Sequence, residues 1–302
     1  MCIRDRYNFM TENIHRANNF IILAGGAALI GFAPIFVRWS EMSPSWVTFY
    51  RMLLAIPFLI LINIYLNKAI VFKIKSKRSI FIALVAAFAF TIDLTLWHWS
   101  IGMTSISNGT IIVNSAPIFV ALIYFFYFKE KLTKYFFISS GVTYLGVVGL
   151  ILSADHYTSG NLLGDIFCII AALFYAIYLV FISRLGKEEA LSIIFYTTLF
   201  VCIFSIPSAL IESSQILPPS LDEWLNLLLL ALLCQVGGQY MITYSIARIS
   251  PSGGSIALLL QPVTATICAA YIFAETVNVI QMLFICIALF GIYLARLNVV
   301  NT

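Results

Sequence analysis

Charged residues are scarce in this sequence, and their scarcity excludes a soluble protein. Only 10% of the 302 residues are Asp, Glu, Lys or Arg, whereas a soluble domain carries about 25%. Hydrophobic residues make up 62% of the chain. A chain so poor in charge and so rich in apolar residues is expected to lie within a lipid bilayer, which is its first expected partner.

Motifs for several kinds of chemistry are also missing. The six cysteines, at positions 2, 168, 202, 234, 268 and 286, form no C-x-x-C pair, so neither a zinc site nor a disulfide framework is predicted. The sequence has no Walker loop, no G-x-S-x-G and no H-E-x-x-H. All its lysines fall in expected loops, which leaves none within an apolar run for a Schiff base. We therefore expect no metal and no cofactor.

Ten apolar runs are long enough to cross a hydrocarbon core of about 30 Å as helices. They cover roughly 19–39, 45–67, 79–103, 105–128, 135–152, 162–183, 190–211, 224–246, 251–273 and 277–296. In lipid the backbone must satisfy its own polar groups, and these runs are too long and too uniformly apolar for barrel strands. The expected fold is an all-α integral membrane protein with ten transmembrane helices. The first run has no small-residue cleavage site after it, so we expect a span and not a cleaved signal peptide.

Positive charge is concentrated on one side of this expected bundle. If the chain starts inside, fifteen of the 17 Lys and Arg residues lie inside, with Arg38 at an outer end and Arg51 within a span. The fifteen are Arg4, Arg6, Arg16, Lys68, Lys73, Lys75, Lys77, Arg78, Lys129, Lys131, Lys134, Arg184, Lys187, Arg248 and Arg296. The positive-inside bias predicts that both termini are cytoplasmic, and it explains the net charge of +4 without a nucleic-acid partner. Residues predicted to be cytoplasmic include Lys75 and Glu188, and those predicted to be external include Asp155 and Ser214.

The chain also contains an internal repeat with an offset of 145 residues. The identical pairs are Ser105/Ser250, Ser107/Ser252, Gly109/Gly254, Ile111/Ile256, Pro117/Pro262, Phe128/Phe273, Glu130/Glu275 and Gly146/Gly291. Each half holds five spans, an odd number, so the second half must enter the membrane in the opposite orientation. We expect two inverted five-helix repeats with a substrate site near the midplane between them. The expected organisation is a cytoplasmic tail (1–18), a first repeat (19–152), a periplasmic linker (153–161), a second repeat (162–296) and a C-terminal tail (297–302).

The repeated motif resembles a known family. The stretch "SISNGTIIVNSAPIFVALIYFFYFKEKLT", followed by "GVTYLGVVGL", recurs as "ARISPSGGSIALLLQPVTATICAAYIFAET…FGIYLAR". This pattern resembles the EamA-type branch of the drug/metabolite transporter superfamily, over residues 19 to 296. The resemblance implies ten helices in two inverted halves, a central cavity that opens alternately to each side, and export or exchange of small metabolites. In the second half "KEKLTK" is replaced by "AETVNV", as the opposite membrane side would lead one to expect.

Two prolines lie within expected spans. Pro117 and Pro262 are each expected to kink a helix, because proline lacks a backbone donor and clashes with the preceding turn. Such a point can serve as a hinge, and the alternative is a static kink that merely fits the packing. Glu130 and Glu275 each follow a proline by thirteen residues, at the end of a span. We expect them to cap a helix or pair across a loop, and not to catalyse.

Asp93 is the most informative residue, because an aspartate at the centre of a membrane helix costs about 2.5–3.5 kcal/mol on insertion scales. Trp97 lies one turn later on the same face, and Gln235 and Gln239 are four residues apart on the eighth run. We expect these pairs to form an acidic wall and an amide wall of one substrate site. Asp93 could instead form a structural ion pair with Arg51, or carry a proton. The glutamines could instead join helices by hydrogen bonds.

Other polar residues are candidates for the same cavity. Thr110 and Asn114 share a stripe with the proline of the fourth run, and Gln261 directly precedes the proline of the ninth. Asn114 and Gln261 are therefore expected to contact substrate. His98 points about 140° around its helix from Asp93 and is expected to be packed or interfacial.

These features predict a secondary active transporter in a bacterial inner membrane. We expect export of small polar or amphipathic metabolites by alternating access, driven by a gradient of substrate or protons because no nucleotide-binding motif is present. An integral-membrane enzyme is the alternative from another class, but the ionisable residues within spans are little more than Arg51, Asp93 and His98. A receptor or scaffold without transport is a third possibility, which is distinguished by whether any solute crosses.

Overall fold

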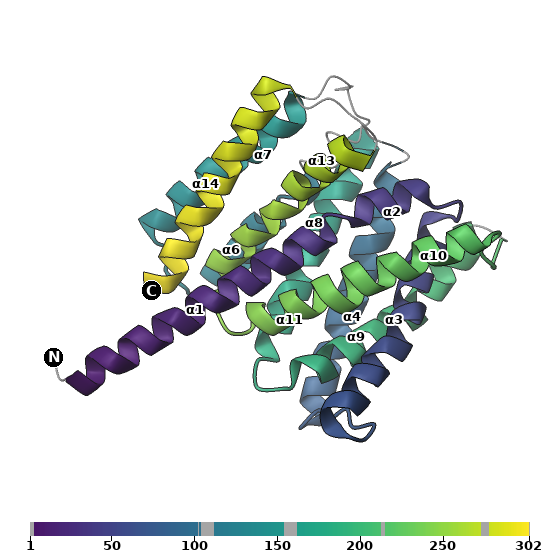
Figure 1. Ribbon diagram of the computed structural model, residues 1–302, viewed down its shortest axis with the longest axis horizontal. Coiled ribbons are helices and arrows are strands. Elements are labelled where there is room, and N and C mark those ends of the chain that lie inside the picture. The colour runs from purple at the N-terminus through teal and green to yellow at the C-terminus, as the bar shows by residue number, and fades with distance from the viewer. Residues whose placement is uncertain are drawn as a thin grey trace.

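A computed structural model describes residues 3–101, 103, 112–153, 162–212, 215–272 and 278–301. Every regular element in these ranges is helical (Figure 1). The described residues contain 9 helices or helix runs that are long and apolar enough to cross a membrane, and Ala116–Phe126 is a shorter apolar helix. The all-helical membrane fold is thus confirmed. The beginning of the expected fourth span, with Thr110, lies outside the described residues, and so do Asp155, Ser214, Glu275 and most of the linker.

The described residues form a succession of helical elements along the chain. They are α1 (Ile3–Ile30), α2 (Ala33–Trp39), α3 (Pro44–Asn67), α4 (Lys77–Ile101), α6 (Ala116–Phe126), α7 (Lys134–Leu152), α8 (Leu162–Arg184), α9 (Ala190–Glu212), α10 (Leu221–Leu230), the π-helix η1 (Ala231–Gln239), α11 (Tyr240–Ile246), α12 (Pro251–Gly254), the 3₁₀-helix η2 (Ser255–Leu259), α13 (Leu260–Ile272) and α14 (Val279–Asn301). Residues 3–18, the expected tail, are helical and form the start of α1, which projects past the other helices (Figure 1). Once a helix has formed, each added residue gains one backbone hydrogen bond, so a spanning helix extends readily into a polar segment.

Local capping residues set several helix ends. Lys68 ends α3 by adopting a left-handed conformation with φ 57°, and its N–H donates to the Ile64 carbonyl at 2.8 Å. Thr133 caps the start of α7 by accepting a hydrogen bond from the Phe136 N–H at 3.1 Å. These two residues mark where α3 ends and where α7 begins, so each of these helices stays close to the length of one span.

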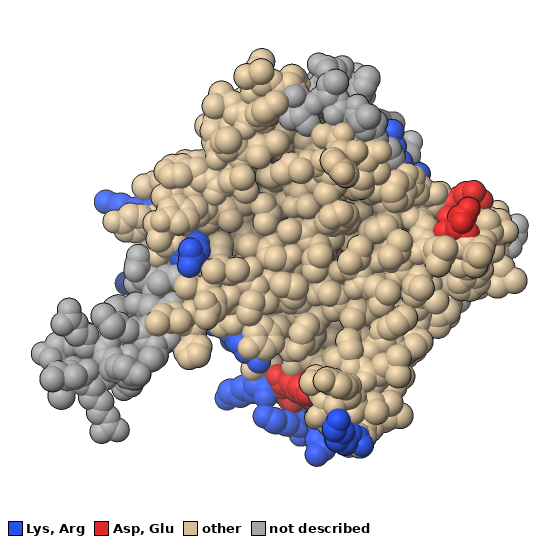
Figure 2. Space-filling model, viewed as in Figure 1, with Lys and Arg blue, Asp and Glu red and all other residues tan. Residues whose placement is uncertain are grey.

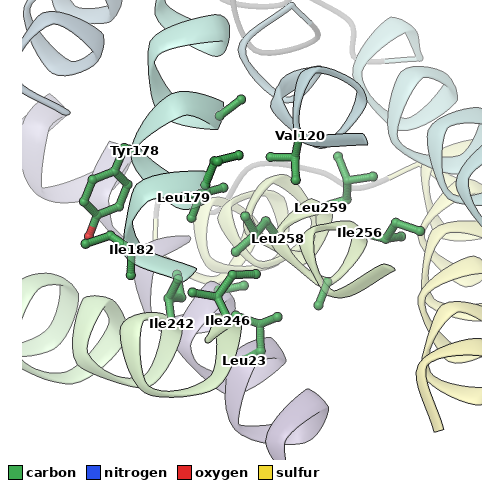
Figure 3. Close-up of a cluster of buried hydrophobic side chains, with 14 of the residues drawn as sticks. Leu23, Val120, Tyr178, Leu179, Ile182, Ile242, Ile246, Ile256, Leu258 and Leu259 are labelled. Atoms are coloured by element: carbon green, nitrogen blue, oxygen red, sulfur yellow. The ribbon is translucent and has the colours of Figure 1, made fainter. Parts of the chain in front are cut away.

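Helices from both halves of the chain pack together in one bundle. In Figure 1, α1 crosses the molecule beside η1 and α11, while α4 packs along α8 and α3 packs along α9. The pair α7 and α14 lies side by side at one edge. Figure 3 shows the centre, where Leu23 of α1 and Val120 of α6 meet Ile182 of α8, Ile246 of α11 and Leu258 of η2. Because these side chains share one core, neither half is packed as an independent domain.

Two glycines bring α7 and α14 into backbone contact. A Cβ on Gly146 would overlap the backbone of Ala288, and a Cβ on Gly291 would overlap the backbone of Thr143. Gly146 and Gly291 are 145 residues apart, and so are Thr143 and Ala288. The contact of Gly146 with Ala288 and the contact of Gly291 with Thr143 are therefore related by the 145-residue offset. We call this a reciprocal contact.

Carboxylates tie the loops together at both ends of the bundle. At one end, the Lys75 N–H donates to Glu188 at 2.9 Å and the Ser79 hydroxyl donates to the same carboxylate at 2.6 Å. At the other end, the Ser45 N–H donates to Glu212 at 2.7 Å. Figure 2 shows Lys and Arg mainly along the lower and left margins of this face, with some at the upper right, and acidic side chains at the right and at the lower margin. The broad area between these margins is uncharged, as a membrane-spanning surface requires.

The glutamate that closes the first repeated motif acts as the sequence predicts. The Glu130 carboxylate accepts hydrogen bonds from the hydroxyls of Ser250 at 2.9 Å and Ser252 at 2.7 Å. These serines begin α12, so Glu130 pairs across loops between the two halves. Its equivalent, Glu275, lies outside the described residues.

Labelling from each side of the membrane tests the orientation. A single cysteine at Lys75 should react with an impermeant maleimide only from the cytoplasmic face, and a cysteine at Asp222 only from the outer face, in a background without native cysteines. Both side chains are exposed, so access to the reagent is decided by the membrane and not by packing. Labelling of position 75 in intact cells would contradict the predicted orientation.

Candidate functional site

Two oppositely charged residues are buried on neighbouring helices. Arg51 of α3 and Asp93 of α4 are each 6% exposed, and the two charges interact electrostatically. Within the described part of the chain they form no salt bridge or hydrogen bond with each other, and the Nε atom of Arg51 is buried without a hydrogen-bond partner. The structure therefore brings the predicted pair together without the direct contact of an ion pair.

Three aromatic rings lie beside these charges. Phe90, one turn before Asp93, stacks on Tyr178 of α8 with ring centroids 4.5 Å apart. Tyr175 lies one turn from Tyr178, with its ring parallel at a centroid distance of 6.0 Å. Arg51 and Asp93 interact electrostatically with both tyrosines. These rings form an aromatic wall that joins α4 of the first half to α8 of the second.

Sequence reasoning did not identify Tyr175 and Tyr178. Their spacing of three residues places them on one face of the sixth run. With 15 tyrosines and 25 phenylalanines in the chain, however, that spacing alone did not distinguish them from aromatic residues that face lipid. Only the approach of α8 to α4 shows that they flank Asp93.

The two predicted glutamines are buried on η1 and reach different helices. The Gln239 Nε2 donates to the Tyr178 hydroxyl at 2.7 Å, and the Gln235 Nε2 donates to Thr198 Oγ1 of α9 at 2.9 Å. The glutamines thus join helices, as the alternative interpretation expected. In both, the Oε1 atom is buried without a hydrogen-bond partner. Gln239 belongs to the site through Tyr178, whereas Gln235 lies against α9.

The local backbone of this segment is unusual. Residues Ala231–Gln239 form a π-helix, a geometry that is often found at functional sites. A Cβ on Gly238 would lie 2.9 Å from the Gly26 carbonyl oxygen, and a Cβ on Gly26 would lie 2.7 Å from the Gly238 carbonyl oxygen. Only glycine permits this close approach of η1 to α1, so the pair sets the position from which Gln239 reaches Tyr178.

The remaining candidates differ in where they lie. The side chain of Gln261, on α13, approaches the Tyr175 hydroxyl and therefore joins the aromatic wall. The Asn114 carbonyl accepts a hydrogen bond from the Tyr144 hydroxyl at 2.9 Å, which places Asn114 beside α7. Trp97 is half-buried, and its ring lies 4.9 Å from that of His98.

His98 is packed, as expected. It is buried, and its Nδ1 lies 3.1 Å from the Thr48 hydroxyl of α3. Among the described residues, no group of three or more His, Cys, Asp and Glu is arranged to hold a metal ion. What the site offers is two opposite charges, aromatic faces and amides, which are groups that recognise a solute.

Both prolines lie where the helical geometry changes. Pro117 lies in the first turn of α6, after a turn at Asn114 and Ser115, and Pro262 lies in the first turn of α13, after the 3₁₀ segment η2. A turn thus interrupts the helix before Pro117, whereas the run Pro251–Ile272 stays helical and changes from 3₁₀ to α geometry before Pro262. Proline fits the first helical turn because its missing N–H would have no intrahelical partner there.

If these sites are hinges, alanine should stiffen them, because it lacks the ring that clashes with the preceding turn and so lets the α-helix continue. Pro117→Ala and Pro262→Ala are each expected to leave the folded yield unchanged and to slow solute turnover roughly tenfold, which corresponds to about 1.4 kcal/mol of barrier. Pro57→Ala is the matched control, because Pro57 is exposed inside the continuous helix α3. Initial rates in proteoliposomes measure the effect. Unchanged rates in both variants would favour a static geometry at both sites.

Comparison with known proteins identifies a family and a shared fold. Residues 19–152 and 162–297 both match the EamA-like transporter family. An "Uncharacterized transporter YetK" of Bacillus subtilis (strain 168) is 23% identical over 284 residues, which cover 91% of this chain and 85% of the relative. An "S-adenosylmethionine uptake transporter" of Rickettsia bellii (strain RML369-C) is 22% identical over 235 residues, covering 76% of this chain and 75% of that protein. A solved crystal structure superposes with a TM-score of 0.80 at 12% identity, over 94% of this chain and 99% of that one, which shows a shared fold.

Proposed function

Because this chain belongs to the EamA-like transporter family, we propose that it moves a small polar or amphipathic solute across the bacterial inner membrane by alternating access. The site that supports this proposal has contributions from both halves. Arg51 and Asp93 come from the first half, and Tyr178, Gln239 and Gln261 come from the second. A site at the interface of two repeats changes its access when one repeat moves against the other.

The packing of the helices supports an inverted repeat. Adding 145 to the residue numbers of α3 gives approximately those of α9, and adding 145 to those of α7 gives approximately those of α14. Each helix is in contact with its equivalent. By the same offset, α4 is equivalent to the segment that contains η1 and α11, and α8 is equivalent to the end of α1. The contact of α4 with α8 is therefore matched by the contact of η1 and α11 with α1. The reciprocal contact of Gly146 with Ala288 and of Gly291 with Thr143 follows the same rule. We propose that the two halves are related by a pseudo-two-fold axis.

We propose that a gradient of substrate or protons drives transport, with export as the direction. No nucleotide-binding motif is present in the sequence. Asp93 is the candidate proton carrier, because it is the buried carboxylate of the site and forms no contact salt bridge with any residue that the structure describes. An intramembrane carboxylate of this kind is typical of proton relays in transporters.

A flux screen in proteoliposomes tests the function. Purified protein is reconstituted with and without an imposed pH gradient, and both uptake and efflux of a panel of solutes are measured. S-adenosylmethionine belongs in the panel because a relative is named for its uptake. We expect saturable flux of at least one solute above protein-free vesicles. Absence of flux for the whole panel in both directions would favour a receptor or scaffold.

A further inference from the structure

We propose that a cavity at the end of the bundle predicted to be cytoplasmic binds a phosphate group, carried by a lipid headgroup or by a soluble phosphate compound, and that this phosphate links the two halves of the chain. The cavity has a volume of about 490 Å³, and the described residues that line it include none from α3, α4 or α8. It is therefore separate from the buried charges described above. Its volume lies in the range of about 300–1,000 Å³ that is typical of small-molecule sites.

Three cations of the described chain line this cavity, and each comes from a different segment. Arg16 belongs to α1, Lys131 to the loop between α6 and α7, and Arg248 to the loop between α11 and α12. One carboxylate, that of Glu130, also lines the cavity, which leaves a net charge of +2. A phosphate monoester carries a charge of about −1.5 to −2 near pH 7 and would balance it.

The cavity lies between the two halves of the chain. The Glu130 carboxylate accepts hydrogen bonds from the hydroxyls of Ser250 at 2.9 Å and Ser252 at 2.7 Å, which holds the loop after α6 against the start of α12. Lys131 directly follows Glu130, and Arg248 precedes Ser250 by two residues. The same contact therefore keeps these two cations on facing loops, and a ligand that bound both would connect the first half to the second.

The side chains offer what a phosphate requires. The Arg248 guanidinium donates to the Tyr244 carbonyl and lies 3.9 Å from the centre of the Tyr244 ring, so it is held in place. Guanidinium N–H groups can donate in pairs to phosphate oxygens, and an ammonium adds a point charge. Lys131 and Arg248 are both exposed and can be reached from solvent. Leu132 and Phe136 also line the cavity and offer contact to carbon atoms next to the phosphate.

The excess of positive charge at this end does not by itself require a binding site, because the positive-inside bias also concentrates cations there. Lys134 provides the comparison. It is exposed and follows Lys131 by three residues, but it does not line the cavity. A diffuse surface charge would attract phosphate through Lys134 as well, whereas a site would depend on the cations that line the cavity.

Three probes test for the phosphate and identify its source. Dihexanoyl-phosphatidic acid is a lipid with a phosphate monoester, glycerol 3-phosphate has the same headgroup without acyl chains, and dihexanoyl-phosphatidylcholine has the chains but no net charge. Shifts in the thermal unfolding of the purified full-length protein in neutral detergent give apparent affinities. We expect phosphatidic acid to bind about tenfold more tightly than phosphatidylcholine, because charge-assisted hydrogen bonds are strong. Equally tight binding of glycerol 3-phosphate would indicate a soluble ligand, and binding of phosphatidic acid alone would indicate a lipid.

Variants locate the binding in the cavity. Lys131→Gln and Arg248→Gln should each weaken the binding of phosphatidic acid about tenfold, because each removes one charged donor. Lys134→Gln is the matched control and should change it less than about twofold, since a separate exposed charge is screened by salt. All three side chains are exposed, so the variants should fold. Equal weakening by all three variants, or phosphatidic acid binding no more tightly than phosphatidylcholine, would overturn the site.

The effect on transport rests on the proposed function. Alternating access requires one repeat to move against the other, so a phosphate that links the halves should favour one state. In phosphatidylcholine vesicles, adding phosphatidic acid or glycerol 3-phosphate, whichever binds more tightly, should slow flux about tenfold in the parent but not in Arg248→Gln. Unchanged flux despite binding would contradict the link between the halves. Absence of flux for every solute would contradict transport alone, because the unfolding shifts are measured without it.

Discussion

Replacing Asp93 with asparagine is expected to leave the protein folded, to lower transport about 100-fold and to remove its dependence on a pH gradient. A 100-fold loss corresponds to about 2.7 kcal/mol of barrier. The amide keeps the size of the side chain but can neither carry a proton nor balance a cation. Initial rates in proteoliposomes, with and without the gradient, measure both effects.

The expected folded yield follows from the geometry of Arg51 and Asp93. Breaking a buried ion pair that is in contact costs about 3–5 kcal/mol, because one charge is left without its partner. In this protein the two charges are not in contact, so the loss of one should change stability much less. Arg51→Gln should likewise give a folded protein with little transport.

A double-mutant cycle decides between the two roles. If both single variants unfold and the double variant Arg51→Gln/Asp93→Asn recovers the yield, the residues are a structural pair. If Asp93→Asn transports like the parent with unaltered pH dependence, Asp93 has no part in the mechanism. The predicted pattern is normal yield in all three proteins and loss of transport in each.

Adding a single methyl group where α7 crosses α14 is expected to destabilise the bundle. Gly146→Ala and Gly291→Ala should each lower the free energy of unfolding by about 3 kcal/mol, at the upper end of the range for overpacking. The new Cβ would overlap the backbone of Ala288 or Thr143, and a backbone cannot rotate away as a flexible side chain can. Thermal unfolding of the purified protein measures the loss.

The same helix supplies the control. Gly141 of α7 is exposed, and a Cβ there would meet no atom within 4 Å. Gly141→Ala should therefore be neutral or slightly stabilising, because alanine favours a helix by about 1 kcal/mol over glycine. Equal behaviour of Gly141→Ala and Gly146→Ala would show that the close contact does not limit stability.

Particular residues show how far sequence reasoning reached into the site. Asp93 and Arg51 were found because charge in an apolar run is conspicuous, and Gln239 and Gln261 because amides are rare there. The structure joins these four around Tyr175 and Tyr178. Two residues with the same polar signal have other contacts: the Asn114 backbone carbonyl accepts from Tyr144 of α7, and the Gln235 side chain donates to Thr198 of α9. The sequence shows which polar residues lie within a span, where burying them is costly. It does not show which residues they contact in the folded protein.

The sequence by itself determined that this protein is a helical membrane protein with an internal repeat at an offset of 145 residues. These properties are local: the length of an apolar run and the need to satisfy its own backbone in lipid require a helix whatever surrounds it. Tertiary structure alone decided that Tyr178 interacts with both Asp93 and Gln239, that Pro117 and Pro262 lie in the first turn of an α-helix, and that the backbone of η1 touches α1 at Gly26. Each of these depends on which faces of distant helices pack together, and packing between helices follows shape complementarity that no single run of residues contains.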